Sequence, residues 1–203
     1  MRHLMTFVSV VVVLASCSPA GESTATSIPT TSADSTTTST PSTTTVPSTT
    51  TTEPPPFSVS SPAFGQDEAI PAEYTCDGAD VSPELNIVGL PEATRAIAVI
   101  VEDPDAPLGV WYHWVEFDIA ADAGSYTIER ATGEIGVAGV NSWHLEGYMG
   151  PCPPEGEEHR YIFRVHALRS TLGLPPGVDA GEVVGAMEGH VIDSVELTGL
   201  YSR

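Results

Sequence analysis

The stretch GYMGPCPPEGEEHRYIFRVHAL, residues Gly147–Leu168, joins a loop rich in glycine and proline to a run with the pattern of a strand. From Arg160 onward, apolar and polar side chains alternate, which is the period of a strand with one buried face. That face would carry Tyr161, Phe163 and Val165, and the loop before it should be stiff because proline fixes φ. The opposite face would carry Arg160, Ile162, Arg164 and His166.

Three further runs are typical of strands. AIAVIVED (Ala96–Asp103) is continuously apolar and β-branched, as in a strand that is buried on both faces. WYHWVEFDI (Trp111–Ile119) alternates, and VELTGLYSR (Val195–Arg203) is the last strand of the chain. Glycine and proline clusters separate these runs at turn-like spacing. Alternation in WYHWVEFDI places on one face the side chains of Trp111, His113, Val115 and Phe117.

One segment, AGEVVGAMEGHVI (Ala180–Ile192), predicts a helix. Asp179 followed by Glu182 resembles a capping box at its start. Gly185 and Gly189 each weaken the helix by about 1 kcal/mol relative to alanine, so that it needs tertiary packing to persist. The predicted class is therefore mainly β, with one or two short helices.

The N-terminal residues 1–16 have the pattern of a secretion signal, with Arg2 and His3 before the apolar core LMTFVSVVVVLA. This core is too short to span a bilayer as a stable helix. It ends in LASC (Leu14–Cys17), which resembles the bacterial lipobox. We predict that Cys17 becomes the lipidated first residue of an exported, membrane-anchored protein that faces outside the cytoplasm. An ordinary signal peptide with an incidental cysteine is the alternative.

Residues 17–56 predict a disordered tether. Of the 39 residues that follow Cys17 up to position 56, 30 are Ser, Thr or Pro. Such a segment buries too little apolar surface to offset the entropy of ordering, and it is a candidate for O-glycosylation. The remaining segment, 57–203, is long enough for one domain with its own core.

The predicted domain is strongly acidic. The chain has 7 basic residues, all arginine, and 27 acidic residues. Without Arg2 and the three acidic residues of the tether, the domain keeps a formal charge of −18. A surface of this sign repels phosphate backbones, which argues against nucleic acid as a partner and against broad adhesion to anionic lipid. An anionic ligand would need a local pocket of hydrogen-bond donors.

Two motifs place polar side chains beside predicted strands. In EDPDAP (Glu102–Pro107), Asp103 and Asp105 either direct carboxylates into a cleft or form an Asp-Pro turn that ends the strand. In WYHW, His113 is either a ligand-binding residue or a hydrogen-bonded core histidine. Both alternatives stay open at this level.

His159 and Arg160 begin the strand that follows the proline-rich loop. Histidine offers an N–H to an anion and arginine offers a fork of donors, but Arg160 also has glutamates nearby. A surface ion pair of this kind would stabilise the domain by only about 0–1 kcal/mol. Cys76 and Cys152 either form one disulfide or remain free thiols.

The sequence gives little support to catalysis. It has no G-x-S-x-G nucleophile elbow, no Gly-rich nucleotide loop, and no zinc-ligand spacing among its aspartates, histidines and cysteines. We therefore expect no cofactor, no metal and no catalytic residues.

The motifs DPDAP, HW and GPCPPxGxxHRYxFxVxAL, in this order, resemble the phosphatidylethanolamine-binding proteins. The more similar branch is the bacterial YbhB/YbcL group, described as Raf kinase inhibitor-like. IPAEYTCDGADVSPEL (Ile70–Leu85) and the later LPPG, GHVI and LTGLY resemble it too, so that the resemblance covers about 57–203. It implies a β-sandwich-like fold, in which a large antiparallel sheet packs on a smaller one, and a small pocket for anions and lipid headgroups.

The same resemblance implies a set of ligand-binding residues. Histidines and backbone N–H groups would donate to the anion, while an aspartate would orient a histidine, accept from an ammonium group or be protonated. Aromatic side chains would form a wall and the proline-rich loop a rim. The set is Asp103, Asp105, Trp111, His113, Tyr148, Gly150, Pro151, His159 and Tyr161.

We thus expect a surface-tethered, non-catalytic binding or regulatory domain with a pocket for a phosphate or a phospholipid-headgroup-like anion. Its partners would be that ligand, the membrane through Cys17, and an envelope protein. Two alternatives are an inhibitor of an extracytoplasmic protease or other hydrolase, and an enzyme for phospho-ester or acyl substrates. The kinase-inhibitor function is not expected here, because export separates the domain from cytosolic kinases.

Overall fold

The computed structural model describes residues 53–203. The predicted domain (57–203) lies within this part, whereas the predicted signal 1–16, the lipidated Cys17 and nearly all of the tether lie outside the described residues. In the part that is described, no helix is both long and apolar enough to cross a membrane.

Strands dominate the described residues. The small sheet has the strand order β1-β3-β6, and the large sheet has the order β2-β9-β8-β4-β5-β7. Neighbouring strands are antiparallel except β2, which runs parallel to β9. The elements are β1 Ser58–Ser60, β2 Glu68–Ala69, the 3₁₀ helix η1 Ala72–Tyr74, β3 Leu85–Leu90, β4 Ala96–Asp103, β5 Trp111–Ala120, β6 Gly124–Ile128, β7 Val137–Ala138, β8 Glu158–Leu168, α1 Ala180–Ala186 and β9 Val191–Ser202.

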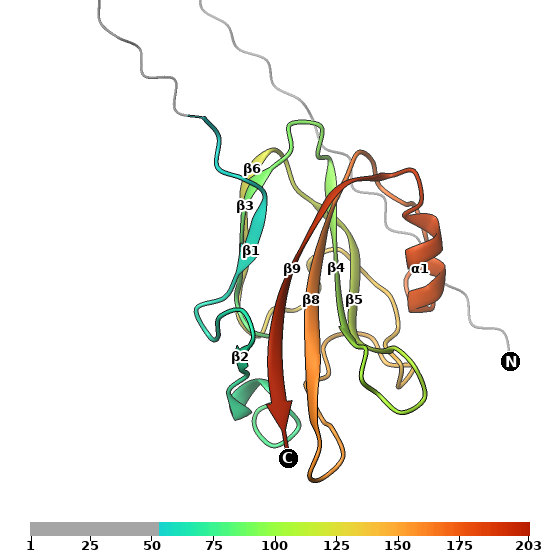
Figure 1. Ribbon diagram of the computed structural model, residues 1–203. Coiled ribbons are helices and arrows are strands. Elements are labelled where there is room, and N and C mark those ends of the chain that lie inside the picture. The colour runs from blue at the N-terminus through green and yellow to red at the C-terminus, as the bar shows by residue number, and fades with distance from the viewer. Residues whose placement is uncertain (1–52) are drawn as a thin grey trace, which may run out of the picture. The chain divides into compact units, whose positions relative to one another are not determined.

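The small sheet covers one face of the large sheet and α1 lies on the other face, as Figure 1 shows. The layers between them are apolar. One buried cluster includes Ile87 of the small sheet and Phe163 of the large sheet, and the other includes Phe117 of the large sheet and Val183 of α1. The predicted class, a mainly β fold with a large antiparallel sheet packed on a smaller one, is confirmed.

Strands β4 and β8 follow the sequence pattern. All of β4 is buried except the half-buried Glu102. In β8 the buried face carries Tyr161, Phe163 and Val165, each 0 % exposed, as the alternation predicts. The two strands pair with each other, and β8 also pairs along its whole length with β9.

Strand β5 departs from the prediction that its alternate residues share one face. Val115 and Phe117 pack in the cluster beneath α1, whereas His113 contacts Tyr161, a member of the cluster between the sheets. The register between β4 and β5 shifts twice, once between Val101 and Glu102. Such bulges change the face to which the following side chains point, and the sequence period alone does not reveal them.

The helix is shorter than predicted. α1 ends at Ala186, and Val191 and Ile192 belong to β9 rather than to a helix extending to residue 192. Gly189, with φ +77°, makes the turn between the two elements. The Asp179 side chain makes no capping hydrogen bond, so the predicted capping box is wrong.

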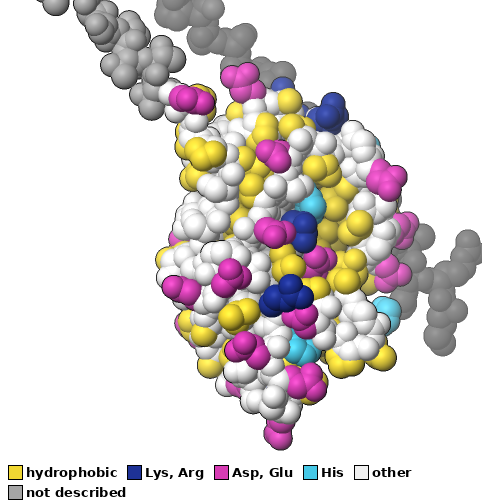
Figure 2. Space-filling model, viewed as in Figure 1, with side chains coloured by type: hydrophobic (Ala, Val, Ile, Leu, Met, Phe, Trp, Pro, Cys, Tyr) yellow, Lys and Arg dark blue, Asp and Glu magenta, His cyan; other side chains and the backbone are white. Residues whose placement is uncertain are grey.

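Positive charge on the outer side of β8 is neutralised locally. Arg160 pairs with Asp105, and Arg164 pairs with Glu102 and Glu196. The face drawn in Figure 2 accordingly shows basic side chains set among acidic ones. The surface therefore keeps the acidic character that the composition predicts.

Candidate functional site

A cavity of about 470 Å³ opens where three strands of the large sheet end. Asp103 is the last residue of β4, Trp111 and His113 begin β5, and His159 is the second residue of β8. Antiparallel pairing brings these ends together: Asp103 lies opposite Trp111. The volume is in the range of small-molecule sites.

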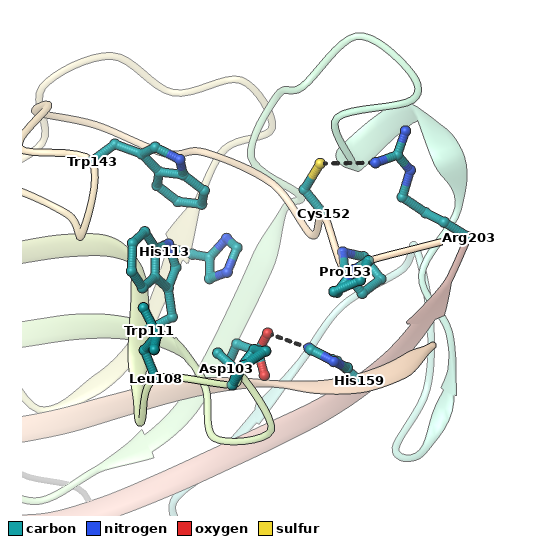
Figure 3. Close-up of a pocket in the computed structure, with 12 residues that line it drawn as sticks. Asp103, Leu108, Trp111, His113, Trp143, Cys152, Pro153, His159 and Arg203 are labelled. Carbon is teal, nitrogen blue, oxygen red and sulfur yellow. Dashed lines mark hydrogen bonds and ion pairs between the residues drawn. The ribbon is translucent and has the colours of Figure 1, made fainter. Parts of the chain in front are cut away.

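Asp103 and His159 form a buried pair on the floor of the cavity (Figure 3). The distance from His159 Nδ1 to Asp103 Oδ2 is 2.7 Å, and the two side chains are 5 % and 6 % exposed. His159 Nε2 lies 3.1 Å from Glu157 Oε2, which belongs to a half-exposed side chain. Burial lowers the pKa of His159, but the hydrogen bonds to Asp103 and Glu157 outweigh this and raise the pKa above its usual value.

This pairing changes the role expected for His159. Both of its ring nitrogens face carboxylates, so that it is held in place rather than open to a ligand. Of the roles considered for Asp103, orienting a histidine is the one that the geometry provides. For His159 to donate from Nε2 to a ligand, the Glu157 side chain would have to move aside.

His113 is the histidine with one ring nitrogen available. Its Nδ1–H donates to the carbonyl oxygen of Met149 at 2.7 Å, because a carbonyl can only accept. Its ring packs edge-on against Trp143 and Tyr161, with centroid distances of 5.0 and 5.1 Å. Burial lowers the pKa of His113 although the contacts with Met149 and Asp103 oppose this. At neutral pH, Nε2 of this ring is therefore an acceptor.

An unpaired donor lies beside this acceptor. The indole Nε1–H of Trp111 is buried and has no hydrogen-bond acceptor among the described residues. The ring of Trp111 meets that of Trp143 edge-on at 5.3 Å. In Figure 3, Trp111, Trp143 and Leu108 stand on one side of the cavity, and His113 projects between them and the opposite wall.

The opposite wall comes from the proline-rich loop and from Arg203, which follows β9. It includes Cys152, Pro153 and Arg203, which Figure 3 shows together. Of the two alternatives left open for the cysteines, the structure has the disulfide between Cys76 and Cys152. The guanidinium of Arg203 reaches Cys152 Sγ at 3.6 Å and Asp77 at 3.1 Å.

Three further contacts hold this loop against the segment around η1. Cys76 N donates to the carbonyl oxygen of Pro151 at 3.1 Å. Gly150 N donates to Asp80 Oδ1 at 2.6 Å, and a Cβ at Gly150 would collide with the carbonyl oxygen of Tyr74. Only glycine fits there, so that the loop wall is fixed by backbone contacts as well as by the disulfide.

Several residues expected in the ligand-binding set lie outside the cavity lining. Asp105 faces the outer side and binds Arg160 at 2.6 and 2.9 Å, and the hydrogen bond from Arg160 lowers the pKa of Asp105 to about 2. Tyr148 donates its hydroxyl to Tyr74 O at 2.8 Å. Tyr161 is fully buried behind His113.

Gly150 and Pro151 support the loop wall without lining the cavity. The residues that the expected set and the cavity share are Asp103, Trp111, His113 and His159.

Sequence reasoning missed Leu108, Trp143 and Arg203 as lining residues. Leu108 directly follows the DPDAP motif, so its position beside that motif is the signal that could have found it; its side chain is 91 % exposed. Trp143 and Arg203 come from distant segments, and only the fold brings them to the cavity. In the described residues, no group of three His, Cys, Asp or Glu side chains is placed to hold a metal ion.

Comparisons with known proteins point to one family. The family model described as "Phosphatidylethanolamine-binding protein" matches residues 60–202. A UPF0098 protein of Pyrococcus abyssi is 44% identical over 149 residues, which are 70% of this chain and 84% of that protein. A UPF0098 protein of Methanothermobacter thermautotrophicus is 45% identical over 147 residues, 70% of this chain and 95% of the relative.

Two solved structures share the fold. A putative phosphatidylethanolamine-binding protein homologue from Chlamydia trachomatis superposes with a TM-score of 0.68 and 33% identity, covering 73% of this chain and 98% of that one. YbcL of E. coli, described as a new member of the mammalian family, has a TM-score of 0.67 and 29% identity over 72% and 98% of the two chains.

Proposed function

This chain belongs to the phosphatidylethanolamine-binding protein family, and we propose that its domain binds a small ligand with a phosphate-like anionic group in the cavity beside Trp111 and His113. The observation that carries this proposal is the buried, unpaired Nε1–H of Trp111 next to a histidine with one available nitrogen. A buried donor without an acceptor costs free energy that a ligand oxygen would recover.

The hydrogen-bonding pattern suits a phosphate monoester that carries one proton. Trp111 Nε1–H would donate to a phosphoryl oxygen, and the P–OH would donate to Nε2 of His113. Arg203 on the opposite wall adds positive charge in a domain that is otherwise acidic. The anion is thus bound mainly by directed hydrogen bonds and one guanidinium rather than by a basic surface.

The floor and rim favour a headgroup that also carries an ammonium and an apolar part. The half-exposed carboxylate of Glu157, which does not line the cavity but lies 3.1 Å from Nε2 of the lining residue His159, would accept from an ammonium group. Leu108 and Trp143 expose apolar surface at the rim, where hydrocarbon would be covered. Because these side chains surround the cavity rather than forming a separate patch, they favour ligand binding over inhibition of a hydrolase.

A non-catalytic role agrees with the chemistry of the lining. Its histidines are hydrogen-bonded to a carbonyl and to carboxylates, and none of them faces a serine or cysteine nucleophile: Cys152 is in the disulfide. Anchoring through Cys17 would hold this binding domain at the outer surface of the cell membrane on its tether.

Calorimetry of the full-length protein with inorganic phosphate, phosphoethanolamine and acetate tests the proposal. We expect binding of the two phosphate ligands, weakened tenfold or more by Trp111→Phe, which removes the N–H and keeps the ring, and by His113→Ala. His166→Ala is the control, because His166 pairs with Ser194 away from the cavity. Unchanged phosphate affinity in both cavity variants would falsify the proposal.

A further inference from the structure

A second cavity, of about 230 Å³, lies on the other side of strand β5 from the α1 cluster and away from the first site. Its walls come from β5, from β7 and from the loops that contain residues 132–134 and 146–148. Three carboxylate side chains line it, from Glu116, Glu134 and Glu146. None of these residues belongs to the cavity of the proposed function.

Glu116 is the unusual member. It sits in the middle of β5 and is 2 % exposed, and its Oε2 has no hydrogen-bond donor among the described residues. Its strand neighbours across the sheet are apolar: Val99 on β4 and Ala138 on β7. A buried carboxylate oxygen without a donor is costly, and native proteins rarely leave one without a ligand or water.

Because Glu116 is surrounded by negative charge, the partner that its Oε2 lacks would be a proton or a cation. No salt bridge within the described part of the chain involves Glu116, Glu134 or Glu146. Burial raises the pKa of Glu116 to about 7 against a hydrogen bond with the Trp114 side chain, which lowers it, and the charges of Glu134 and Glu146 raise it further. The net negative charge of the domain also raises the local concentration of cations.

The walls favour an organic cation over a metal ion. The three carboxylates do not converge as a metal-binding group, and none is placed so in the described residues. Trp114 and Tyr148 both line the cavity, with their rings edge-to-face at 5.8 Å. Aromatic faces attract ammonium groups, and an ammonium N–H would satisfy a carboxylate oxygen that a methylated cation would leave unpaired.

We propose that this cavity is a second binding site, which takes the protonated primary amine of a small ligand, paired with Glu116 and enclosed by Trp114 and Tyr148. Glu134 and Glu146, both exposed, attract the cation at the mouth of the cavity. The site is independent of the phosphate-like ligand, since it uses neither His113 nor Trp111.

Isothermal titration calorimetry of the full-length protein with ethylammonium chloride at pH 8 tests the site. We expect binding to the wild type and a loss of at least tenfold in affinity for Glu116→Gln, which keeps the shape and removes the charge. Glu182→Gln is the matched control, because it removes one negative charge from the exposed side of α1. This control should bind as the wild type does.

Glu146→Gln keeps the test decisive if Glu116→Gln does not fold. Glu146 is exposed, so its substitution leaves the fold intact, and we expect affinity to fall about threefold. Three results would overturn the proposal. The first is that the wild type does not bind ethylammonium, and the second is that it binds Ca²⁺ or tetramethylammonium more tightly than ethylammonium. The third is that Glu116→Gln, or Glu146→Gln where the first variant does not fold, binds ethylammonium with wild-type affinity.

Discussion

The cavity beside Trp111 and His113 and the cavity beside Glu116 share strand β5 but differ in the buried polar residue that β5 supplies. In the first, His113 is buried and its Nδ1–H donates to a backbone carbonyl. In the second, Glu116 is equally buried, but its Oε2 has no donor among the described residues. Each cavity holds a buried polar atom without a partner among the described residues, but the chemistry differs: the first offers the Trp111 Nε1–H donor, which suits an anion, whereas the second offers the Glu116 Oε2 acceptor, which suits a proton or a cation.

The support of each cavity differs as well. The first is closed by a loop that the disulfide, Gly150 and Asp80 hold in place. The second is bordered by the short strand β7 and by exposed loop residues such as Glu134. Preorganisation lowers the entropy cost of binding, so we expect the first cavity to depend more on distant covalent and backbone contacts.

Removal of the disulfide should have the largest effect and should separate the two cavities. Cys76 and Cys152 are 76 residues apart. A cross-link of that span lowers the conformational entropy of the unfolded chain, which stabilises the folded state by about 4 kcal/mol. We expect Cys76→Ser/Cys152→Ser to lower the free energy of unfolding by about that amount in urea denaturation. Phosphate affinity should fall more than ethylammonium affinity, because Cys152 itself lines the first cavity whereas the loop contributes only Gly147 and Tyr148 to the second. An equal loss of both would remove the distinction.

Asp103→Ala should come next, because it leaves His159 buried without its principal partner. Breaking a buried charged pair of this kind costs about 3 kcal/mol. This variant and His159→Ala should have similar denaturant midpoints. The double variant should unfold at nearly the same denaturant concentration as either single variant. Additive losses would show that the two side chains do not act as a pair.

Glu116→Gln should stabilise the domain in a pH-dependent manner. The pKa of Glu116 is raised on folding from 4.5 to about 7, so the folded state binds the extra proton between these values. The contribution of Glu116 to wild-type stability should therefore fall as pH rises from about 4.5 to 7, by at most about 3 kcal/mol, and it is measured as the difference between the wild type and Glu116→Gln. The variant lacks this group and should be about 2 kcal/mol more stable than the wild type at pH 8, with no difference in slope near pH 4.

Thermal unfolding from pH 4 to 8 provides that measurement, with Glu182→Gln as the control that should keep the wild-type profile. Parallel profiles for wild type and Glu116→Gln would mean that Glu116 titrates normally. The second cavity would then lose its distinguishing feature.

Arg160→Ala should have the smallest effect. Arg160 forms a two-point ion pair with Asp105, but both side chains are substantially exposed. Such pairs contribute about 0–1 kcal/mol, and neither residue lines the cavity beside Trp111 and His113. We expect a change below 1 kcal/mol in urea denaturation and unchanged affinity for phosphate and ethylammonium. A tenfold loss of phosphate affinity would return this ion pair to the ligand-binding site.

Part of the site could be predicted from the sequence because strand ends are visible in it. Asp103, Trp111, His113 and His159 lie at the ends of runs with clear strand periods, and antiparallel pairing gathers such ends. Asp105, two residues from Asp103, could not be assigned in the same way. The sequence pattern does not distinguish these two aspartates, because both lie in the same turn. The folded turn directs the carboxylate of Asp105 toward Arg160 on the outer side of the sheet.

The periods of apolar residues by themselves determined β4, β8 and the mainly β class, since the burial of a strand face follows from local alternation. Only the tertiary structure decided which distant groups meet. The disulfide bond between Cys76 and Cys152 and the position of Arg203 at the cavity depend on loops packing together. The burial of Glu116 depends on pairing with β4 and β7 and on a bulged register. These outcomes arise from contacts between segments that no local pattern encodes.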